Sequence, residues 1–172
     1  SKGELPVDMV ILAMGVRPNA DLARSAGLEI GVTGAVRVDD RLRTSDPAIY
    51  AAGDCVECTG IVTGKPCYVP LGSTANKQGR VAAVNICGGD ETFPGVLGTT
   101  ICKVFDFSVA RTGLNEGMAR QGGFEIETCL VPGPDRAHFM PAAPMIMPKL
   151  VAERGTGRLL GIQAVGAGES AK

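Results

Sequence analysis

Aromatic side chains and an excess of charge of either sign are what this 172-residue sequence has least of. Phe, Trp and Tyr together make up 4% of the residues, and tryptophan is absent. The 17 Lys and Arg residues balance 18 Asp and Glu, which leaves a formal net charge of -1 and a pI near 5.8. We therefore expect neither nucleic acid nor an anionic membrane surface as an electrostatic partner.

Long apolar runs are absent as well. No stretch approaches the roughly 18 to 20 apolar residues that a bilayer span needs, and Ser1 to Glu4 lack the apolar core of a signal peptide. The six cysteines are spread along the chain, which does not favour a secreted disulfide framework. We expect a cytoplasmic protein whose thiols are reduced and mostly buried.

Glycine and proline are abundant, with 24 and 11 residues. The chain is 45% apolar and 20% charged, with a mean hydropathy of +0.16, which is typical of a globular protein. Many glycines and few bulky core residues indicate numerous turns and close backbone approaches, a composition that suits cofactor binding.

The first half of the chain predicts an α/β arrangement. Residues 7–14 form a nearly continuous apolar run that stops at Gly15, which is typical of a strand buried on both faces of a parallel sheet. Residues 48–52 predict a second apolar strand, which ends at Gly53 and Asp54. We expect this strand end to be the first chemical site.

Two helices and a hairpin are predicted around these strands. A short helix is expected over 20–26, and a hairpin is expected around the turn at 31–34. A longer helix is expected over 73–86, with a hydroxyl residue at its N-cap and a Gly88-Gly89 stop.

The second half predicts an α+β lobe with a mainly antiparallel sheet. The boundary is expected within 89–98, which divides the chain into a first domain at 1–92 and a second at 93–172. The expected elements of this lobe are strands near 99–107, 124–130, 149–153 and 159–165, with one helix near 115–121.

A Gly-Asp pair at a strand end, followed by a loop and a helix, can hold a polyol and an anionic group. Asp54 can accept hydrogen bonds from sugar hydroxyls, and Gly53 lets a ligand approach the backbone. The N–H groups at the start of the following helix supply positive partial charge. Taken alone, however, the pair is also typical of an ordinary turn.

Longer segments resemble one known family. Residues 44–55 closely resemble the second FAD-binding motif of the pyridine nucleotide-disulfide oxidoreductases, and residues 7–19 resemble the motif that precedes it. Residues 68–80 are similar to the segment that opens the flavin-facing helix in the NADH oxidase and coenzyme A-disulfide reductase branch. Residues 98–106, 112–114, 149–151 and 160–163 resemble parts of the family's C-terminal dimerisation domain.

The resemblance implies an α/β portion of an FAD domain, preceded by the end of an NAD domain and followed by an α+β dimerisation lobe. It implies an enzyme that passes electrons from NAD(P)H through FAD to a small-molecule acceptor, which is a disulfide, oxygen or peroxide. It also implies a homodimer formed through the C-terminal lobe. The expected cofactor-binding residues are Gly15, Gly53, Asp54, Leu71, Gly72, Ser73, Thr74 and Ala75.

Several parts that the family needs are not found in this sequence. The Gly-rich βαβ unit for the FAD pyrophosphate, its redox cysteine and the Gly-rich unit for the nicotinamide cofactor are missing. We therefore expect a fragment that does not turn over alone, with no catalytic residue and no metal ligand of its own. Phe139 and Met140 stand where the family usually has paired tyrosines, which counts against a coenzyme A-disulfide substrate.

Two other interpretations stay open. The chain can be a non-enzymatic dimerisation module, or a metal-binding protein that uses Cys55, Cys58 and Cys67 as ligands. The pattern Gly-x-Gly-x-x-Ala at 166–171 also matches the opening of a dinucleotide fingerprint. The single histidine, His138, lies far from the cysteines in sequence and is expected in a loop or on the surface.

Overall fold

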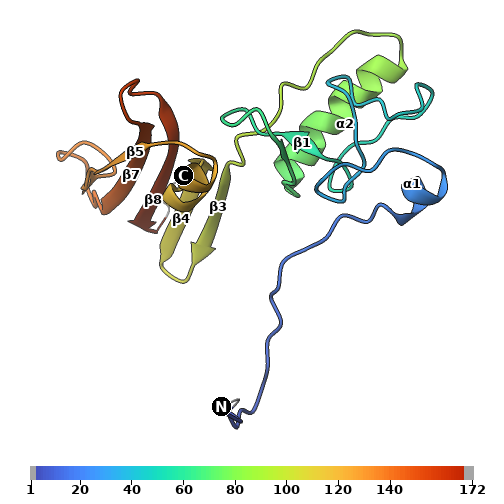
Figure 1. Cartoon of the computed structure of the whole chain (residues 1–172). Coiled ribbons are helices and arrows are strands. Elements are labelled where there is room, and N and C mark those ends of the chain that lie inside the picture. The colour runs from blue at the N-terminus through green and yellow to red at the C-terminus, as the bar shows by residue number, and fades with distance from the viewer. Residues whose placement is uncertain (1–2, 169–172) are drawn as a thin grey trace.

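The computed structural model describes residues 3–168, which form two lobes joined by the segment 87–99 (Figure 1). The first lobe contains α1 (Asp21–Ser25), β1 (Cys58–Thr59), β2 (Pro66–Cys67) and α2 (Gly72–Ile86). The second contains β3 (Thr100–Val104), β4 (Phe107–Gly113), α3 (Glu116–Gln121), β5 (Ile126–Leu130), β6 (Gly133–Pro134), β7 (Met145–Glu153) and β8 (Leu159–Ala167). The expected order, a helix-containing first lobe before a mainly antiparallel second lobe, is confirmed.

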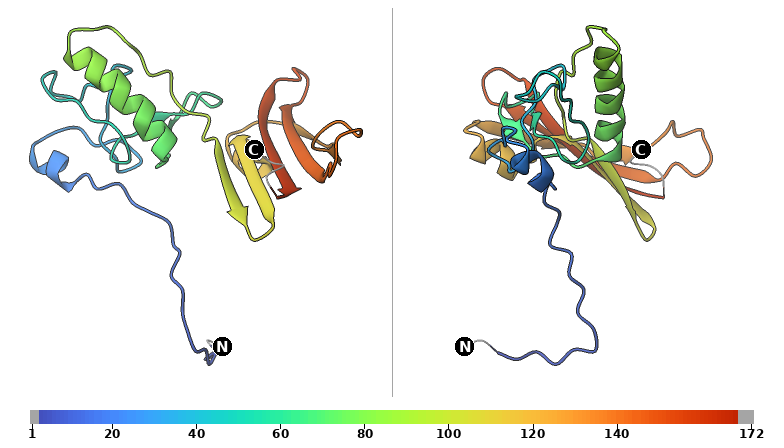
Figure 2. Two further views of the ribbon diagram at one scale, coloured as in Figure 1. Left: turned by 180° about the vertical axis from the view of Figure 1, so that it is seen from behind. Right: turned by 90° about the vertical axis from the view of Figure 1, so that its right-hand side faces the viewer.

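The segment before α1 does not form the predicted strand. Residues 7–14 run away from both lobes as an extended trace (Figures 1 and 2), and their apolar side chains are exposed. Met14, for example, is 90% exposed. A buried parallel strand needs a neighbour on each side for its backbone groups, and no described strand pairs with these residues. The prediction of a buried strand here is wrong for this structure.

The remainder of the first lobe is built from single bridges rather than long ladders. Ile30 pairs with Val36, which confirms the predicted hairpin, and Val36 also forms a parallel bridge with Val56. The predicted strand over 48–52 contributes only one bridge, between Tyr50 and Arg43. This apolar run is therefore not a strand, because no described element offers it a continuous partner. Two small groups of buried residues hold this lobe together, namely Ala20, Val36 and Val56, and Leu42, Val81 and Ala82.

Helix α2 is the longest of the described helices, and one of its faces packs into the core of this lobe. Its buried residues are Gln78, Val81, Ala82 and Asn85, which follow the i, i+3, i+4, i+7 spacing of one helix face. The N-cap is Leu71, in an extended conformation and without a side-chain hydrogen bond. The predicted hydroxyl N-cap is therefore wrong, because Ser73 and Thr74 lie inside the first turn.

The second lobe is one antiparallel sheet with the strand order β3-β4-β8-β7-β5. Strand β6 pairs with the N-terminal end of β7. The predicted strand at 99–107 is in fact a hairpin, since β3 turns at Phe105 and Asp106 into β4. Phe105 has φ 52°, a conformation usually taken by Gly or Asn. The sequence carries no turn residue of that kind to mark the reversal.

Helix α3 packs on one end of this sheet. Asn115 caps it by accepting a hydrogen bond from the N–H of Met118 at 2.9 Å. The core under the helix contains Leu114, Ala119, Val151 and Leu160, and Val62 of the first lobe packs against it. Arg158 also donates to the carbonyl of Val62 at 2.8 Å, which links the two lobes.

Close backbone approach makes Gly161 necessary at the centre of the sheet. A Cβ at this position would collide with the backbone of Leu114, whose carbonyl carbon would lie 2.9 Å away. Gly161→Ala should therefore lower the free energy of unfolding by about 1–3 kcal/mol, measured by urea denaturation. Gly133→Ala is the matched control, because a Cβ there meets open space. Equal stability of the two variants would contradict this account.

Candidate functional site

The turn at Gly53 and Asp54 lies against the first turns of α2. The N–H of Gly53 donates to Oε1 of Gln78 at 2.8 Å, and Gly53 has φ 86°. A Cβ at Gly53 would lie 3.5 Å from the Cβ of Ala75, so the turn and the helix are in contact. Asp54 follows with an exposed side chain. The structure thus places an accessible carboxylate next to the start of a long helix.

Gln78 positions this turn. Its side chain is fully buried, at 0% exposure, and its Nε2 donates to Sγ of Cys58 at 3.2 Å. One amide therefore joins the Gly53 turn, the helix and β1. Gln78 was not among the residues expected at the site. The sequence feature that could have identified Gln78 is its position on the buried face of α2, which it shares with Val81, Ala82 and Asn85.

The start of α2 keeps free hydrogen-bond donors. No side chain caps it, and its first turn contains no acidic residue. The N–H of Ala75 already donates to the carbonyl of Leu71 at 2.9 Å, so the donors left are those of Gly72, Ser73 and Thr74. These groups carry the positive end of the helix dipole. An anionic or electron-rich ligand at this end would be stabilised by them.

The predicted site residues are brought together only in part. Gly53, Asp54 and Ala75 meet at the turn, and the segment from Leu71 to Thr74 leads into the same end of α2. Gly15 has φ 85°, but it lies in the projecting N-terminal segment, where a Cβ would have no neighbour within 4 Å. The structure does not bring Gly15 to the turn.

Tyr68 lies close to this site. Burial raises the pKa of its phenol, and the carboxylate of Asp54 and the thiol of Cys55 raise it further. The phenol is therefore a protonated hydrogen-bond donor at neutral pH. Tyr68 was expected only as part of the motif at 68–80, with no role of its own.

The cysteines do not form the alternative metal site. Sγ of Cys55 donates to the carbonyl of Ala52 at 3.4 Å, whereas Cys58 faces Cys67 across β1 and β2. Within residues 3–168, no three Cys, His, Asp or Glu side chains converge as metal ligands. All six cysteines are free thiols, but Cys87, Cys102 and Cys129 are exposed, so the expectation of mostly buried thiols is wrong.

The described part of the Gly-x-Gly-x-x-Ala pattern begins inside a strand. Gly166 lies inside β8, where it pairs with Ser108 and Ile146, so the first glycine belongs to a strand. Residues 169–171, which complete the pattern, lie outside the described residues. His138 is exposed in the loop between β6 and β7, as expected.

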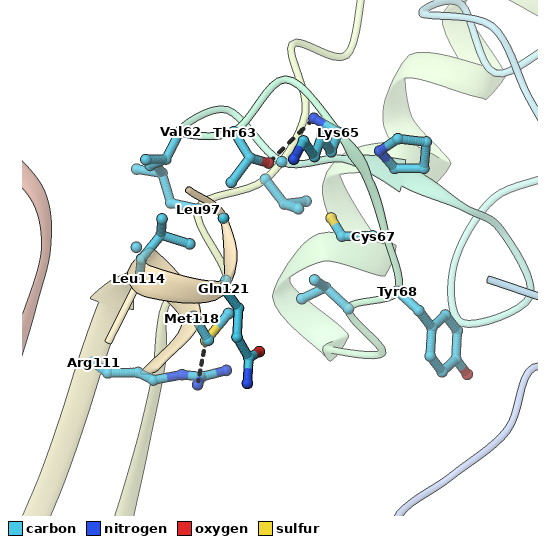
Figure 3. Close-up of a pocket in the computed structure, with 17 residues that line it drawn as sticks. Val62, Thr63, Lys65, Cys67, Tyr68, Leu97, Arg111, Leu114, Met118 and Gln121 are labelled. Carbon is cyan, nitrogen blue, oxygen red and sulfur yellow. Dashed lines mark hydrogen bonds between the residues drawn. The ribbon is translucent and has the colours of Figure 1, made fainter. Parts of the chain in front are cut away.

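A cleft of 380 Å³ opens between the two lobes (Figure 3). Cys67 and Tyr68 line it from the first lobe, and Leu114 and Met118 line it from the second. The guanidinium of Arg111 donates to the sulfur of Met118 at 3.7 Å on one wall of the cleft.

The described helices include none that is long and apolar enough to cross a membrane.

Comparison with known proteins decides the family. Residues 1–80 match the family model described as pyridine nucleotide-disulphide oxidoreductase, and residues 99–171 match the dimerisation domain of the same family. The chain belongs to the pyridine nucleotide-disulphide oxidoreductase family. The resemblance read from residues 7–19, 44–55 and 68–80 is thereby confirmed.

Curated relatives of the chain are enzymes from archaea and bacteria. The chain is 45% identical over 165 residues to the NAD(P)H sulfur oxidoreductase (CoA-dependent) of Pyrococcus abyssi, covering 96% of the chain and 37% of that protein. It is 39% identical to the NADH oxidase of Methanocaldococcus jannaschii, covering 93% of the chain and 35% of that protein. The chain thus spans little more than a third of the length of these relatives.

Solved structures give the same result. A NAD-dependent persulfide reductase from A. fulgidus matches with a TM-score of 0.92 and 54% identity, over 96% of the chain and 31% of that protein. Reduced CoADR-RHD of Bacillus anthracis matches with a TM-score of 0.88 and 41% identity, over 93% of the chain and 29% of that protein.

The geometry of the turn predicts the effect of removing the Gln78 amide. In Gln78→Leu the N–H of Gly53 loses its acceptor, which should lower the free energy of unfolding by about 1–3 kcal/mol. Urea denaturation measures this change. Asn76→Leu, an exposed amide on the same helix, is the control and should change stability by less than about 0.5 kcal/mol. If both variants unfold at the same urea concentration, Gln78 does not hold the turn.

Proposed function

We propose that this chain supplies the flavin-binding turn and the dimerisation lobe of an FAD-dependent NAD(P)H oxidoreductase. The observation that carries the proposal is the exposed carboxylate of Asp54, which lies beside the uncapped start of α2, in a turn whose Gly53 N–H donates to buried Gln78. A carboxylate and free N–H donors side by side suit a ligand that has both hydroxyls and an electron-rich ring. FAD is such a ligand.

Each residue of the turn has a part in holding FAD. Asp54 accepts hydrogen bonds from the hydroxyls of the ribityl chain, and Gly53 leaves the backbone open to the ligand. The N–H groups of Gly72, Ser73 and Thr74 favour negative charge next to them, because they carry the positive end of the helix dipole. FAD held by these residues would supply the redox chemistry, namely hydride uptake from NAD(P)H and electron transfer to the acceptor.

The acceptor we favour is a sulfur compound, that is, a disulfide or a persulfide. The relatives of this chain support this choice. The persulfide reductase is 54% identical to this chain, whereas the NADH oxidase of Methanocaldococcus jannaschii is 39% identical. Oxygen and peroxide are the other acceptors that the family resemblance allows.

We place the domain boundary between residues 92 and 93, and we propose that the protein is cytoplasmic.

A homodimer through the second lobe is part of the same proposal. The family model for the dimerisation domain covers residues 99–171. Val109, Val165 and Met147 are register partners across β4, β8 and β7, so their side chains share one face of the sheet. Together with three neighbours on that face they form what we name the apolar patch, with each member 38 to 55% exposed. Its members are Val104, Phe107, Val109, Met145, Met147 and Val165.

The position of the patch supports a second copy as its partner. Helix α3 covers only one end of this face, where Lys149 pairs with Glu116 at 2.7 Å. The remaining end has no cover among residues 3–168. Contiguous exposed apolar side chains of this kind mark a contact surface between proteins.

The dimer predicts that a charge on the patch breaks it. Phe107→Asp should convert the dimer to a monomer at micromolar concentration, measured by sedimentation velocity, because a carboxylate would be buried without a partner. Ile101→Asp is the control, since Ile101 pairs with Ala110 on the opposite face of the sheet and is also exposed. A protein that is monomeric from the start, or a Phe107→Asp dimer, would overturn the assignment of the patch.

The flavin assignment is tested by removing the carboxylate. In the flavin-loaded enzyme that carries this chain, Asp54→Ala should weaken FAD binding about tenfold to a hundredfold, because hydrogen bonds to a charged group are lost. Flavin fluorescence during titration of the apoenzyme measures the affinity. The control is Glu125→Ala, which removes an exposed carboxylate from the second lobe. Unchanged FAD affinity in Asp54→Ala would show that the site is wrongly assigned.

A further inference from the structure

Two cysteines of the first lobe stand directly opposite each other. Cys58 of β1 and Cys67 of β2 are register partners in an antiparallel pair, so their side chains leave the same face. The exposed cysteines on strands have no such arrangement, because Cys102 faces Val109 and Cys129 faces Leu150. The opposed pair is therefore specific to β1 and β2 among the described strands.

The backbone spacing of this pair suits a disulfide. Opposed residues in antiparallel strands have Cα atoms about 4.5 to 5.5 Å apart. A disulfide accepts Cα separations of about 4.4 to 6.8 Å. The Cα separation typical of such a pair therefore falls within the range that a disulfide accepts.

The two thiols differ in access. Cys67 is partly exposed and lines the cleft between the lobes, where Figure 3 shows its sulfur among the lining side chains. Cys58 is 6% exposed and receives the hydrogen bond from Nε2 of Gln78. A small molecule in the cleft can therefore reach Cys67, whereas Cys58 is nearly buried and does not line this cleft.

We propose that Cys58 and Cys67 are a thiol pair that closes a reversible disulfide by exchange with a small organic disulfide in the cleft. Cys67 attacks one sulfur of that molecule, which breaks its S–S bond, forms a mixed disulfide and releases one thiol. Cys58 then attacks the sulfur of Cys67 and releases the second thiol. The two cysteines lose two electrons and two protons, and the small disulfide gains both as two thiols.

The rate of this exchange should increase with pH, because the attacking thiol of Cys67 must lose its proton. Burial raises the pKa of Cys67 to about 11, and the neighbouring thiol of Cys58 and carboxylate of Glu57 add to the effect. The thiolate is the nucleophile, and its fraction grows as the pH increases. At pH values below this pKa, the rate should therefore rise about tenfold for each unit by which the pH is raised. The pair is slow at neutral pH, and it forms one specific bridge because the second thiol is already in place.

Oxidised glutathione is a suitable probe, and the 172-residue chain is a suitable protein. The triple variant Cys87→Ser, Cys102→Ser, Cys129→Ser removes the exposed thiols and leaves Cys55, Cys58 and Cys67. At pH 9 this variant should lose two of its three thiols. Peptide mapping should find the bridge between Cys58 and Cys67, and dithiothreitol should reverse it.

Two further substitutions in the same background separate the roles. Cys55→Ser should form the bridge at an unchanged rate, because Cys55 points to the carbonyl of Ala52. Cys58→Ser should stop at the mixed disulfide on Cys67. Circular dichroism checks that each variant is folded, and where Cys58→Ser does not fold, mapping of the parent and of Cys55→Ser decides.

Three results would overturn the proposal. They are a mixed disulfide on Cys67 that persists although Cys58 is present, a bridge that includes Cys55, and no loss of thiols at pH 9. None of these readouts requires flavin. The thiol pair and the proposed flavin turn can therefore fail independently.

Discussion

The first lobe depends on the two hydrogen bonds of one buried amide. Gln78 accepts from the N–H of Gly53 at 2.8 Å and donates to Sγ of Cys58 at 3.2 Å. A fully buried amide is stable only when its groups are paired, so these bonds fix the turn, the helix and β1 as a unit. The position of Asp54 beside the start of α2 is a consequence of that unit.

The second lobe is held by different forces. Its antiparallel ladder runs through five strands, and α3 closes one end of a face by apolar packing and by the pair of Lys149 with Glu116. The nearby Lys149 ammonium lowers the pKa of the Glu116 carboxyl, and Arg120 adds to this shift. The other end of that face is left apolar and exposed. A rigid sheet that presents such a surface is suited to assembly, whereas the first lobe is suited to ligand binding.

Much of this could be predicted from the sequence, for local reasons. Helices were expected over 73–86 and near 115–121, and strands near 149–153 and 159–165, where the structure has α2, α3, β7 and β8. These expectations rest on sequence patterns that act over a few residues. The turn at Gly53 and Asp54 was expected because an apolar run at 48–52 precedes it and because residues 44–55 resemble a family motif.

What could not be predicted depends on partners distant in sequence or on missing turn signals. The bond from Gly53 to Gln78 spans 25 residues, and nothing local marks it. The reversal at Phe105 and Asp106 uses a residue that seldom adopts a positive φ. The run at 7–14 has the composition of a buried strand, but burial depends on neighbours that no described residue provides.

Hydrogen-deuterium exchange is the most direct test of the central claim, that the turn held by Gln78 at the start of α2 binds the flavin. The enzyme that carries this chain is compared with and without FAD, and exchange is resolved by peptide. The account predicts that FAD slows exchange in peptides that contain Gly53, Asp54 and the segment from Gly72 to Thr74, with little change in β7 and β8. Protection confined to the cleft between the lobes, with none at the turn, would contradict it.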